Sequence, residues 1–255
     1  MPDGINFAFL HGGGQGSWVW RETISALDRQ TDGTFGRALA LDVPGCGEKR
    51  DRGTKGTTFD AIVDELIADL EEARMTEVVL VGHSQAGTVM AHLVERRPDL
   101  FRRLIYVSCS IPLPGQNVME MIGDGVHGSD ENKVGWPVDF KTTSARERTE
   151  IMFCNDMDEK ETADLMTRLG GDQWPPDAYA ATNWQLSQLD KVPASYVLCL
   201  RDNILPVTWQ ETFAGRFHAE KIVRIDAGHQ VMNTRPHALA EVLLREAGRA
   251  EAARR

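Results

Sequence analysis

Short apolar runs alternate with longer amphipathic segments along the first 110 residues and again near the end of the chain. The short runs are typical of buried strands, and we expect six, at residues 5–10, 36–42, 77–82, 102–108, 195–200 and 221–226. The longer segments predict helices near residues 19–30, 59–73, 84–97, 206–216 and 236–247. This alternation predicts an α/β fold with a doubly wound, mostly parallel six-stranded sheet and helices on both of its faces.

The alternation is interrupted once, between the fourth and fifth strands. Residues 112–190 are dense in proline, glycine, aspartate and glutamate, and they show a helical pattern only in places such as 143–154 and 158–169. We interpret this stretch, called the cap segment below, as a mainly helical subdomain inserted after the fourth strand. Residues 1–111 and 191–255 then form the core domain.

Composition narrows the class of protein. With 255 residues, 42% of them apolar, and a net charge of −10, the chain has the composition of a soluble globular protein. The negative charge disfavours partners such as nucleic acids and anionic membranes. The N-terminus lacks a secretory signal pattern, and no run approaches the roughly 18 apolar residues of a membrane span, so we expect a cytoplasmic monomer or homodimer.

The cysteines and histidines show no metal-binding spacing. Cys46, Cys109, Cys154 and Cys199 lie far apart, and two of them fall in apolar strand-like runs, which favours buried free thiols. We therefore expect no metal and no cofactor.

A possible nucleophile lies between a predicted strand and a predicted helix. In EVVLVGHSQAG, Ser84 follows an almost wholly apolar strand and precedes an apolar helix. A sharp strand-to-helix turn needs small residues two positions before and after the nucleophile, and these are Gly82 and Ala86. Ala86 departs from the literal G-x-S-x-G pattern but satisfies its steric requirement.

A serine nucleophile needs a base and an acid that orients it. In this type of fold they follow in the order serine, acid, histidine, on loops after later strands. Asp202 lies at the carboxyl edge of the fifth strand, and His229 is in the loop after the sixth. All three side chains are thus predicted at the carboxyl edge of the sheet, as a catalytic triad.

Other residues are weaker candidates. Asp226 lies only three positions before His229 and is expected to be still in the strand. The loop after the fourth strand has no carboxylate. The remaining histidines are predicted to shape the glycine loop (His11), to be structural (His83 and His92), or to lie on the surface (His127, His218 and His237).

The glycine run after the first strand predicts an oxyanion hole. In FLHGGGQGSWVW, glycine lets backbone N–H groups approach a substrate oxygen, and we assign the donors to the N–H groups of Gly13 and Gln85. A phosphate loop is disfavoured, because no lysine follows and the third glycine of the dinucleotide pattern is missing.

The cap segment carries apolar and aromatic side chains that can cover a substrate pocket or form the core of the cap itself. The residues predicted to line a pocket are Gly12, His83, Met119, Trp136, Met152 and Trp184.

Taken together, HGGGQGSWVW, LDVPGCG, GHSQAG, RDNILP and AGH resemble the α/β-hydrolase superfamily. Within it, the chain resembles the small-cap group of plant methyl esterases, hydroxynitrile lyases and their bacterial relatives. The resemblance covers most of residues 5–110 and 190–247 and is weaker in the cap. It implies that a lyase needs a lysine after the catalytic histidine and a threonine after the first-strand histidine, where this chain has Gln230 and Gly12.

These observations predict a serine esterase that cleaves a small, largely apolar carboxylic ester or lactone through an acyl-enzyme on Ser84. The alternatives on the same scaffold are a cofactor-free oxygenase, a carbon–carbon hydrolase and a hydroxynitrile lyase. A small-molecule receptor with vestigial catalysis is a further alternative, because a fold does not fix a function.

Overall fold

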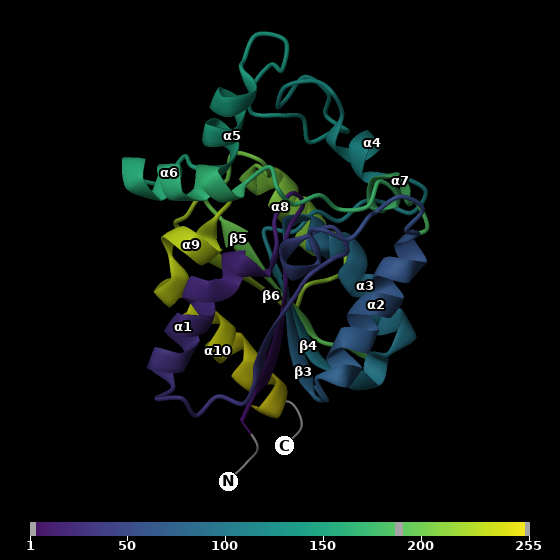
Figure 1. Ribbon diagram of the computed structural model, residues 1–255, viewed down its shortest axis with the longest axis vertical. Helices are drawn as coiled ribbons and strands as arrows, with labels where there is room; N and C mark the ends of the chain where they lie inside the picture. The colour runs from purple at the N-terminus through teal and green to yellow at the C-terminus, as the bar shows by residue number, and fades with distance from the viewer. Residues whose placement is uncertain (1–3, 187–190, 253–255) are drawn as a thin grey trace.

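A six-stranded sheet forms the centre of the molecule, whose computed structural model describes residues 4–186 and 191–252 (Figure 1). The strands are β1 (Asn6–Leu10), β2 (Ala38–Leu41), β3 (Val78–His83), β4 (Phe101–Val107), β5 (Ala194–Cys199) and β6 (Lys221–Ile225). Their spatial order is β2-β1-β3-β4-β5-β6, and every ladder is parallel. The predicted α/β fold is confirmed, and the sheet is wholly rather than mostly parallel.

Both faces of the sheet are covered, which explains why its strands read as nearly continuous apolar runs. In β1, Phe7 and Phe9 pack on one face, while Ala8 and Leu10 pack on the other. The same period of two continues through the neighbouring strands, so the sheet separates two apolar cores.

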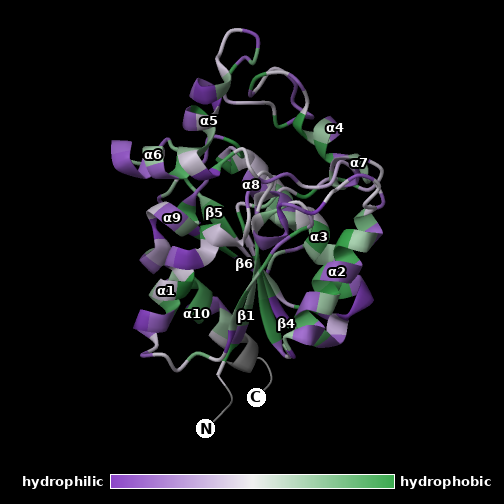
Figure 2. Ribbon diagram, viewed as in Figure 1, coloured by the Kyte–Doolittle hydropathy of each residue, from purple (hydrophilic) through white to green (hydrophobic). Residues whose placement is uncertain are grey.

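Helices form a layer on each face. On one face lie α1 (Arg21–Gln30) and α10 (Pro236–Ala252), and on the other lie α2 (Phe59–Glu72), α3 (Gly87–Arg96) and α8 (Val207–Arg216). Figure 2 shows the apolar sides of α2 and α3 turned towards the strands. A short helix, α9 (Val231–Thr234), and the 3₁₀ turns η1 (Ser17–Trp20), η2 (Gly47–Lys49), η3 (Ser84–Ala86) and η4 (Pro98–Leu100) complete this part.

The cap segment joins β4 to β5 and lies beyond the carboxyl ends of the strands, at the top of Figure 1. It contains α4 (Val118–Ile122), α5 (Ala145–Phe153), α6 (Glu159–Arg168) and α7 (Asp177–Ala180). Its named elements are all helices, although most of its described residues lie in turns and loops. Residues 187–190, where we placed its end, lie outside the described residues, so that boundary stays a prediction.

The cysteines of the chain are all buried and free, as predicted. Burial raises the pKa of Cys46 to about 12 and that of Cys154 to about 11, so both thiols stay protonated at neutral pH. Within residues 4–186 and 191–252, no helix has the length and apolar character needed to cross a membrane.

Candidate active site

Ser84 lies at a strained turn between β3 and η3. Its φ is +54°, in the left-handed region that non-glycine residues rarely adopt. The turn also requires two close approaches. A Cβ atom at Gly82 would lie 2.3 Å from Met90 Sδ, and one at Gly87 would lie 2.6 Å from the carbonyl oxygen of Ser110. Gly87 faces backbone and therefore needs to be glycine, whereas a side chain at Gly82 would require Met90 to move. The two glycines thus allow α3 to pack closely behind Ser84.

His229 and Asp202 form a buried pair. His229 Nδ1 donates to Asp202 Oδ2 over 2.6 Å, and the two side chains are 1% and 0% exposed. Because the carboxylate can only accept, Nδ1 carries the proton, and Nε2 is left as the basic nitrogen of the neutral ring. Ser84 and His229 line the same cavity. The three predicted triad residues therefore meet at one edge of the sheet.

The Asp202 carboxylate is held by several donors. Its Oδ1 accepts from the backbone amides of Ile204 (2.7 Å) and Leu205 (2.9 Å), and Oδ2 also accepts from the hydroxyl of Ser108. Ser108 follows β4 directly and has a φ of +41°. The loop after β4 thus has no carboxylate, as noted from the sequence, but its Ser108 hydroxyl donates to Asp202. Only the three-dimensional pairing of β4 with β5 reveals this role.

Asp226 is not part of this arrangement. Its side chain is 73% exposed and forms an ion pair with Arg201 Nε at 2.7 Å. Asp202 is thus the carboxylate that orients His229.

His83 supports the backbone of His229. Its Nε2 donates to the carbonyl oxygen of His229 over 2.9 Å. Burial and the neighbouring His229 ring lower the pKa of His83 well below its ordinary value, so this ring is neutral. The prediction of a structural role is consistent with this contact, although His83 also lines the cavity.

The glycine loop, residues 12–14, packs closely against Ser84. His11 Nδ1 donates to the carbonyl oxygen of Gly12 (2.8 Å), and His11 Nε2 accepts from the amide of Val43 (3.2 Å). Burial lowers the pKa of His11, which favours this neutral form. A Cβ atom at Gly12 would lie 2.9 Å from Ser84 Cβ, so only glycine fits there. His11 therefore shapes the loop, as predicted.

Gly13 and Gln85, the predicted oxyanion donors, line the same cavity as Ser84. Gln85 follows Ser84 in the turn, and Gly13 lies opposite on the glycine loop: a Cβ atom at Gly13 would lie 2.4 Å from Gln85 Oε1. The glycine loop and the turn that carries Gln85 therefore lie against each other beside Ser84.

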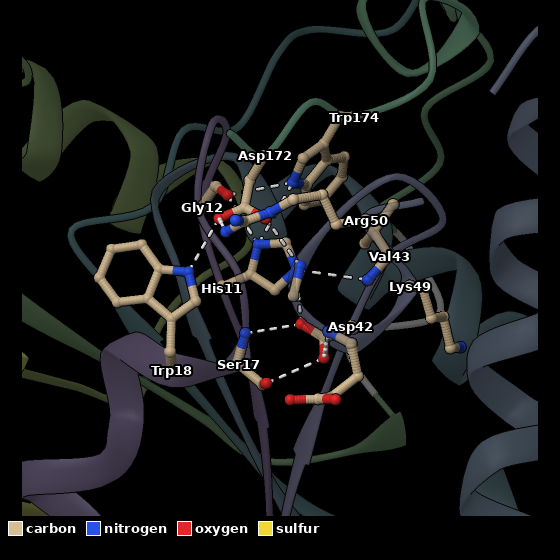
Figure 3. A network of polar contacts seen from close by, with 12 residues as sticks. His11, Gly12, Ser17, Trp18, Asp42, Val43, Lys49, Arg50, Asp172 and Trp174 are labelled. Carbon is tan, nitrogen blue, oxygen red and sulfur yellow. Dashed lines mark hydrogen bonds and ion pairs between the residues drawn. The ribbon is translucent and has the colours of Figure 1, made fainter. Parts of the chain in front are cut away.

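A polar network fixes the glycine loop to the cap segment (Figure 3). Asp172, from the cap, accepts from Trp18 Nε1 (2.8 Å) and from Arg50 Nε (2.9 Å) and Nη2 (3.0 Å). Burial raises the pKa of Asp172, but its hydrogen bonds outweigh that and hold the pKa below its usual value. Trp174, two residues further on, donates to the carbonyl oxygen of Gly12 (3.0 Å). Cap and loop are therefore one connected structure.

The cap segment also binds the two loops that carry Asp202 and His229. Asn155 Nδ2 donates to the carbonyl oxygen of Arg201 (2.7 Å). Asn203 Nδ2 donates to the carbonyl oxygen of Ile151 (2.9 Å). The core residues in these two bonds, Arg201 and Asn203, flank Asp202 in the sequence.

On the histidine loop, Asp156 Oδ2 accepts from the amide of Gly228 (2.9 Å) and the hydroxyl of Thr234 (3.0 Å). His127 is a further link: its ring nitrogens lie 2.8 Å from the carbonyl oxygen of Val134 and 2.9 Å from that of Asn203. The prediction that His127 is an ordinary surface histidine was wrong, because the packing of the cap on the core half-buries it.

The cavity beside Ser84 has a volume of about 170 Å³. Five of the six residues predicted to line it do so: Gly12, His83, Met119, Trp136 and Met152. The other lining residues, most of which the sequence did not single out, are Gly13, Gln15, Ser84, Gln85, Ser110, Val118, Ile122, Phe153, Tyr179, Ile204, Leu205 and His229. Burial raises the pKa of Tyr179 to about 12, so its hydroxyl remains a donor at neutral pH.

Trp184 does not line this cavity, which corrects the prediction. It is only 4% exposed and packs edge-on against Phe59 and His92, with ring centroids 5.4 and 5.7 Å away. Its indole nitrogen donates to the carbonyl oxygen of Gln116. These contacts also confirm a structural role for His92. His218 and His237 are exposed, as predicted.

A larger groove of about 320 Å³ lies between α6 and the core, lined by residues such as Trp18, Arg168 and Thr234. It contains none of the triad residues, so size alone does not identify the site. In the described part of the chain, no three His, Cys, Asp or Glu side chains are grouped so that they could hold a metal ion.

The comparison with known families agrees with the fold. The model of the alpha/beta hydrolase family matches residues 7–242. The chain belongs to this family.

Its relatives include named esterases. The chain is 26% identical over 253 residues to putative methylesterase 11, chloroplastic, of Arabidopsis thaliana, covering 94% of this chain and 63% of that protein. It is 24% identical over 257 residues to polyneuridine aldehyde esterase of Rauvolfia serpentina, covering 94% of each chain. The chain therefore spans less than two thirds of the Arabidopsis relative.

Solved structures show the same fold at low identity. An extracellular alpha/beta-hydrolase from a Paenibacillus species superposes with a TM-score of 0.75 at 19% identity, over 96% of this chain and 99% of that one. The crystal structure of polyneuridine aldehyde esterase gives a TM-score of 0.72 at 19% identity, over 96% of this chain and 100% of that one.

Proposed function

We propose that this protein is a serine esterase that cleaves a small, largely apolar carboxylic ester or lactone through an acyl-enzyme on Ser84. One observation carries the proposal. Ser84, at a strained φ of +54°, lines one cavity with a His229 whose other ring nitrogen donates to the buried Asp202. The named esterases among the relatives support the same reaction class.

In the first half of the reaction, Ser84 Oγ attacks the ester carbonyl carbon while His229 Nε2 takes the hydroxyl proton. Asp202 stabilises the imidazolium that forms. The N–H groups of Gly13 and Gln85 bind the negative oxygen of the tetrahedral intermediate. As that intermediate collapses, His229 returns the proton to the leaving alcohol, and the acyl group remains on Ser84.

In the second half, water attacks the acyl carbon and gives its proton to His229 Nε2. Collapse of the second intermediate releases the carboxylic acid and returns the proton to Ser84 Oγ. Apart from the substrate and this water, these steps use only side-chain and backbone groups of the chain.

The cavity suits a small substrate. A cavity of roughly 150 Å³ lined by apolar side chains holds a benzene-sized molecule, and this one measures about 170 Å³. Much of its wall is apolar, including Val118, Ile122 and Leu205. This supports an ester whose acyl or alcohol group is a short chain or a single ring.

The proposal is tested with a fluorophosphonate probe and a panel of short-chain esters and lactones. We expect the wild type to be labelled once per chain and to hydrolyse members of the panel. Ser84→Ala should lose both properties, and Ser25→Ala on α1 should keep both. Turnover by Ser84→Ala at the wild-type rate would refute the nucleophile. A wild type that is neither labelled nor able to hydrolyse the panel would favour a receptor with vestigial catalysis. Release of cyanide, uptake of oxygen or cleavage of a carbon–carbon bond would favour the other scaffold chemistries.

A further inference from the structure

Gln15 is a buried amide with no partner for its hydrogen bonds. Its side chain is 0% exposed, and neither Nε2 nor Oε1 has a hydrogen-bond partner among the described residues. Buried polar groups are nearly always paired, because an unpaired one loses its bonds to water without compensation. Where such an amide also lines a cavity, a bound ligand can supply the missing partner.

The position of Gln15 indicates what that partner is. Gln15 lines the same cavity as Ser84 and His229, two residues after the predicted oxyanion donor Gly13. The side-chain Nε2 of Gln85, in the same wall, is also buried and without a partner. The cavity thus combines apolar surface with a few unsatisfied polar atoms, which is how small-molecule sites fix the orientation of a ligand.

The charge of the cavity limits the chemistry further. No lysine, arginine, aspartate or glutamate is among its lining residues in the described part of the chain. A substrate substituent at Gln15 is therefore neutral, because a buried ion without a counter-charge is strongly disfavoured. Of the neutral groups with a single oxygen atom, a hydroxyl can accept from Nε2 and donate to Oε1, whereas a ketone or ether oxygen can use only Nε2.

We propose that Gln15 is a specificity-determining residue that hydrogen-bonds a hydroxyl group of the ester substrate. The inference rests on the esterase function proposed above and narrows its substrate class to small, uncharged hydroxy esters. A site built to bind a hydroxyl discriminates against the analogue that lacks it, since its own polar atoms then remain unpaired.

The test compares methyl butyrate with methyl 2-hydroxybutyrate and methyl 3-hydroxybutyrate. For each hydroxy ester, kcat/KM is divided by the value for methyl butyrate, in wild type and in Gln15→Met, which has a similar shape but no amide. We expect the ratio for at least one hydroxy ester to fall about tenfold in the variant, or about 1.4 kcal/mol. The melting temperature should stay equal or rise, because no protein hydrogen bond is lost.

Gln230→Met is the matched control. Gln230 is also 0% exposed with both amide atoms unpartnered, but it does not line the cavity. Its substitution should leave the ratio unchanged. If Gln15→Met changes kcat/KM equally for all three esters, or lowers the melting temperature with an unchanged ratio, the proposal is overturned and Gln15 has a structural role. If Gln15→Met does not fold, Gln15→Asn must show the same fall in the ratio. Failure of the esterase function itself would look different: the wild type would hydrolyse none of the three esters.

Discussion

Asp156 connects the cap segment to the loop of His229, the proposed general base, so its removal should lower the rate of ester hydrolysis. Its side chain is 0% exposed, and Oδ2 accepts from the amide of Gly228, directly before His229, and from the hydroxyl of Thr234. Asp156 does not line the cavity. We therefore expect Asp156→Ala to change kcat much more than KM, because it shifts His229 without touching the substrate.

The expected losses of stability and of kcat in Asp156→Ala both follow from these contacts. A hydrogen bond to a charged group contributes about 1.5–3 kcal/mol, so losing two destabilises the protein considerably. Part of this is offset because Asp156→Ala also removes a buried carboxylate whose Oδ1 has no hydrogen-bond partner among the described residues. We expect a net loss of about 2–3 kcal/mol in the free energy of unfolding. A displacement of about 1 Å in the base can lower kcat about 100-fold.

The assay is steady-state ester hydrolysis together with urea unfolding, at a temperature where each variant is folded. Asp156→Asn keeps one acceptor for the Gly228 amide, and we expect it to restore kcat to within about tenfold of the wild type. Asp158→Ala removes a nearby aspartate that caps α6 by accepting from the amide of Glu161 (2.8 Å), and it should cost about 1 kcal/mol without changing kcat. An Asp156→Ala enzyme with a normal kcat would refute the positioning role, as would Asp158→Ala with the same loss of kcat.

Two further predictions concern buried histidines and the glycine loop. Burial lowers the pKa of His11, His83 and His92, so below about pH 6.5 the unfolded chain binds protons that the folded chain does not. Stability should therefore fall as the pH drops through 6.5, by up to about 1.4 kcal/mol per pH unit for each histidine. Urea unfolding at pH 7.5, 6.5 and 5.5 measures this slope; His92→Gln should reduce it and exposed His237→Gln should not, and a flat profile would contradict the prediction. A Cβ atom at Gly12 would lie 2.9 Å from Ser84 Cβ, whereas one at Gly14, with a φ of +68°, would meet nothing within 4 Å. Gly12→Ala should thus lower kcat/KM about 100-fold, while Gly14→Ala should cost only about 1 kcal/mol of stability; equal activities of the two variants would exclude this packing effect.

The sequence predicted the fold and the proximity of Ser84, Asp202 and His229 because both depend on order along the chain. Each strand of a doubly wound sheet is a short apolar run, and the carboxyl ends of parallel strands meet at one edge. The positions of Ser84, Asp202 and His229 after their strands therefore determined that they come together. No such rule relates Ser108 to Asp202, because that contact depends on which strands are neighbours.

The cap segment could not be predicted to the same extent. Helices α4 and α7 have five and four residues, too few to show a helical period. The sequence also does not show which aromatic side chains face the cavity, so Trp136 was placed correctly and Trp184 was not. Likewise, the role of Gln15 depends on the absence of partners for its amide, which only coordinates reveal.

The cap contacts both the cavity and the loops that carry Asp202 and His229, and it does so through neighbouring residues at the end of α5. Met152 and Phe153, at the end of α5, form part of the cavity wall. Asn155 and Asp156, directly after them, bind the loops of Asp202 and His229. A change in the position of this end of α5 therefore alters the shape of the cavity and the support of the triad together. Substitutions at the end of α5 should therefore change kcat as well as substrate preference. Substitutions at Met119, on α4, should change substrate preference alone.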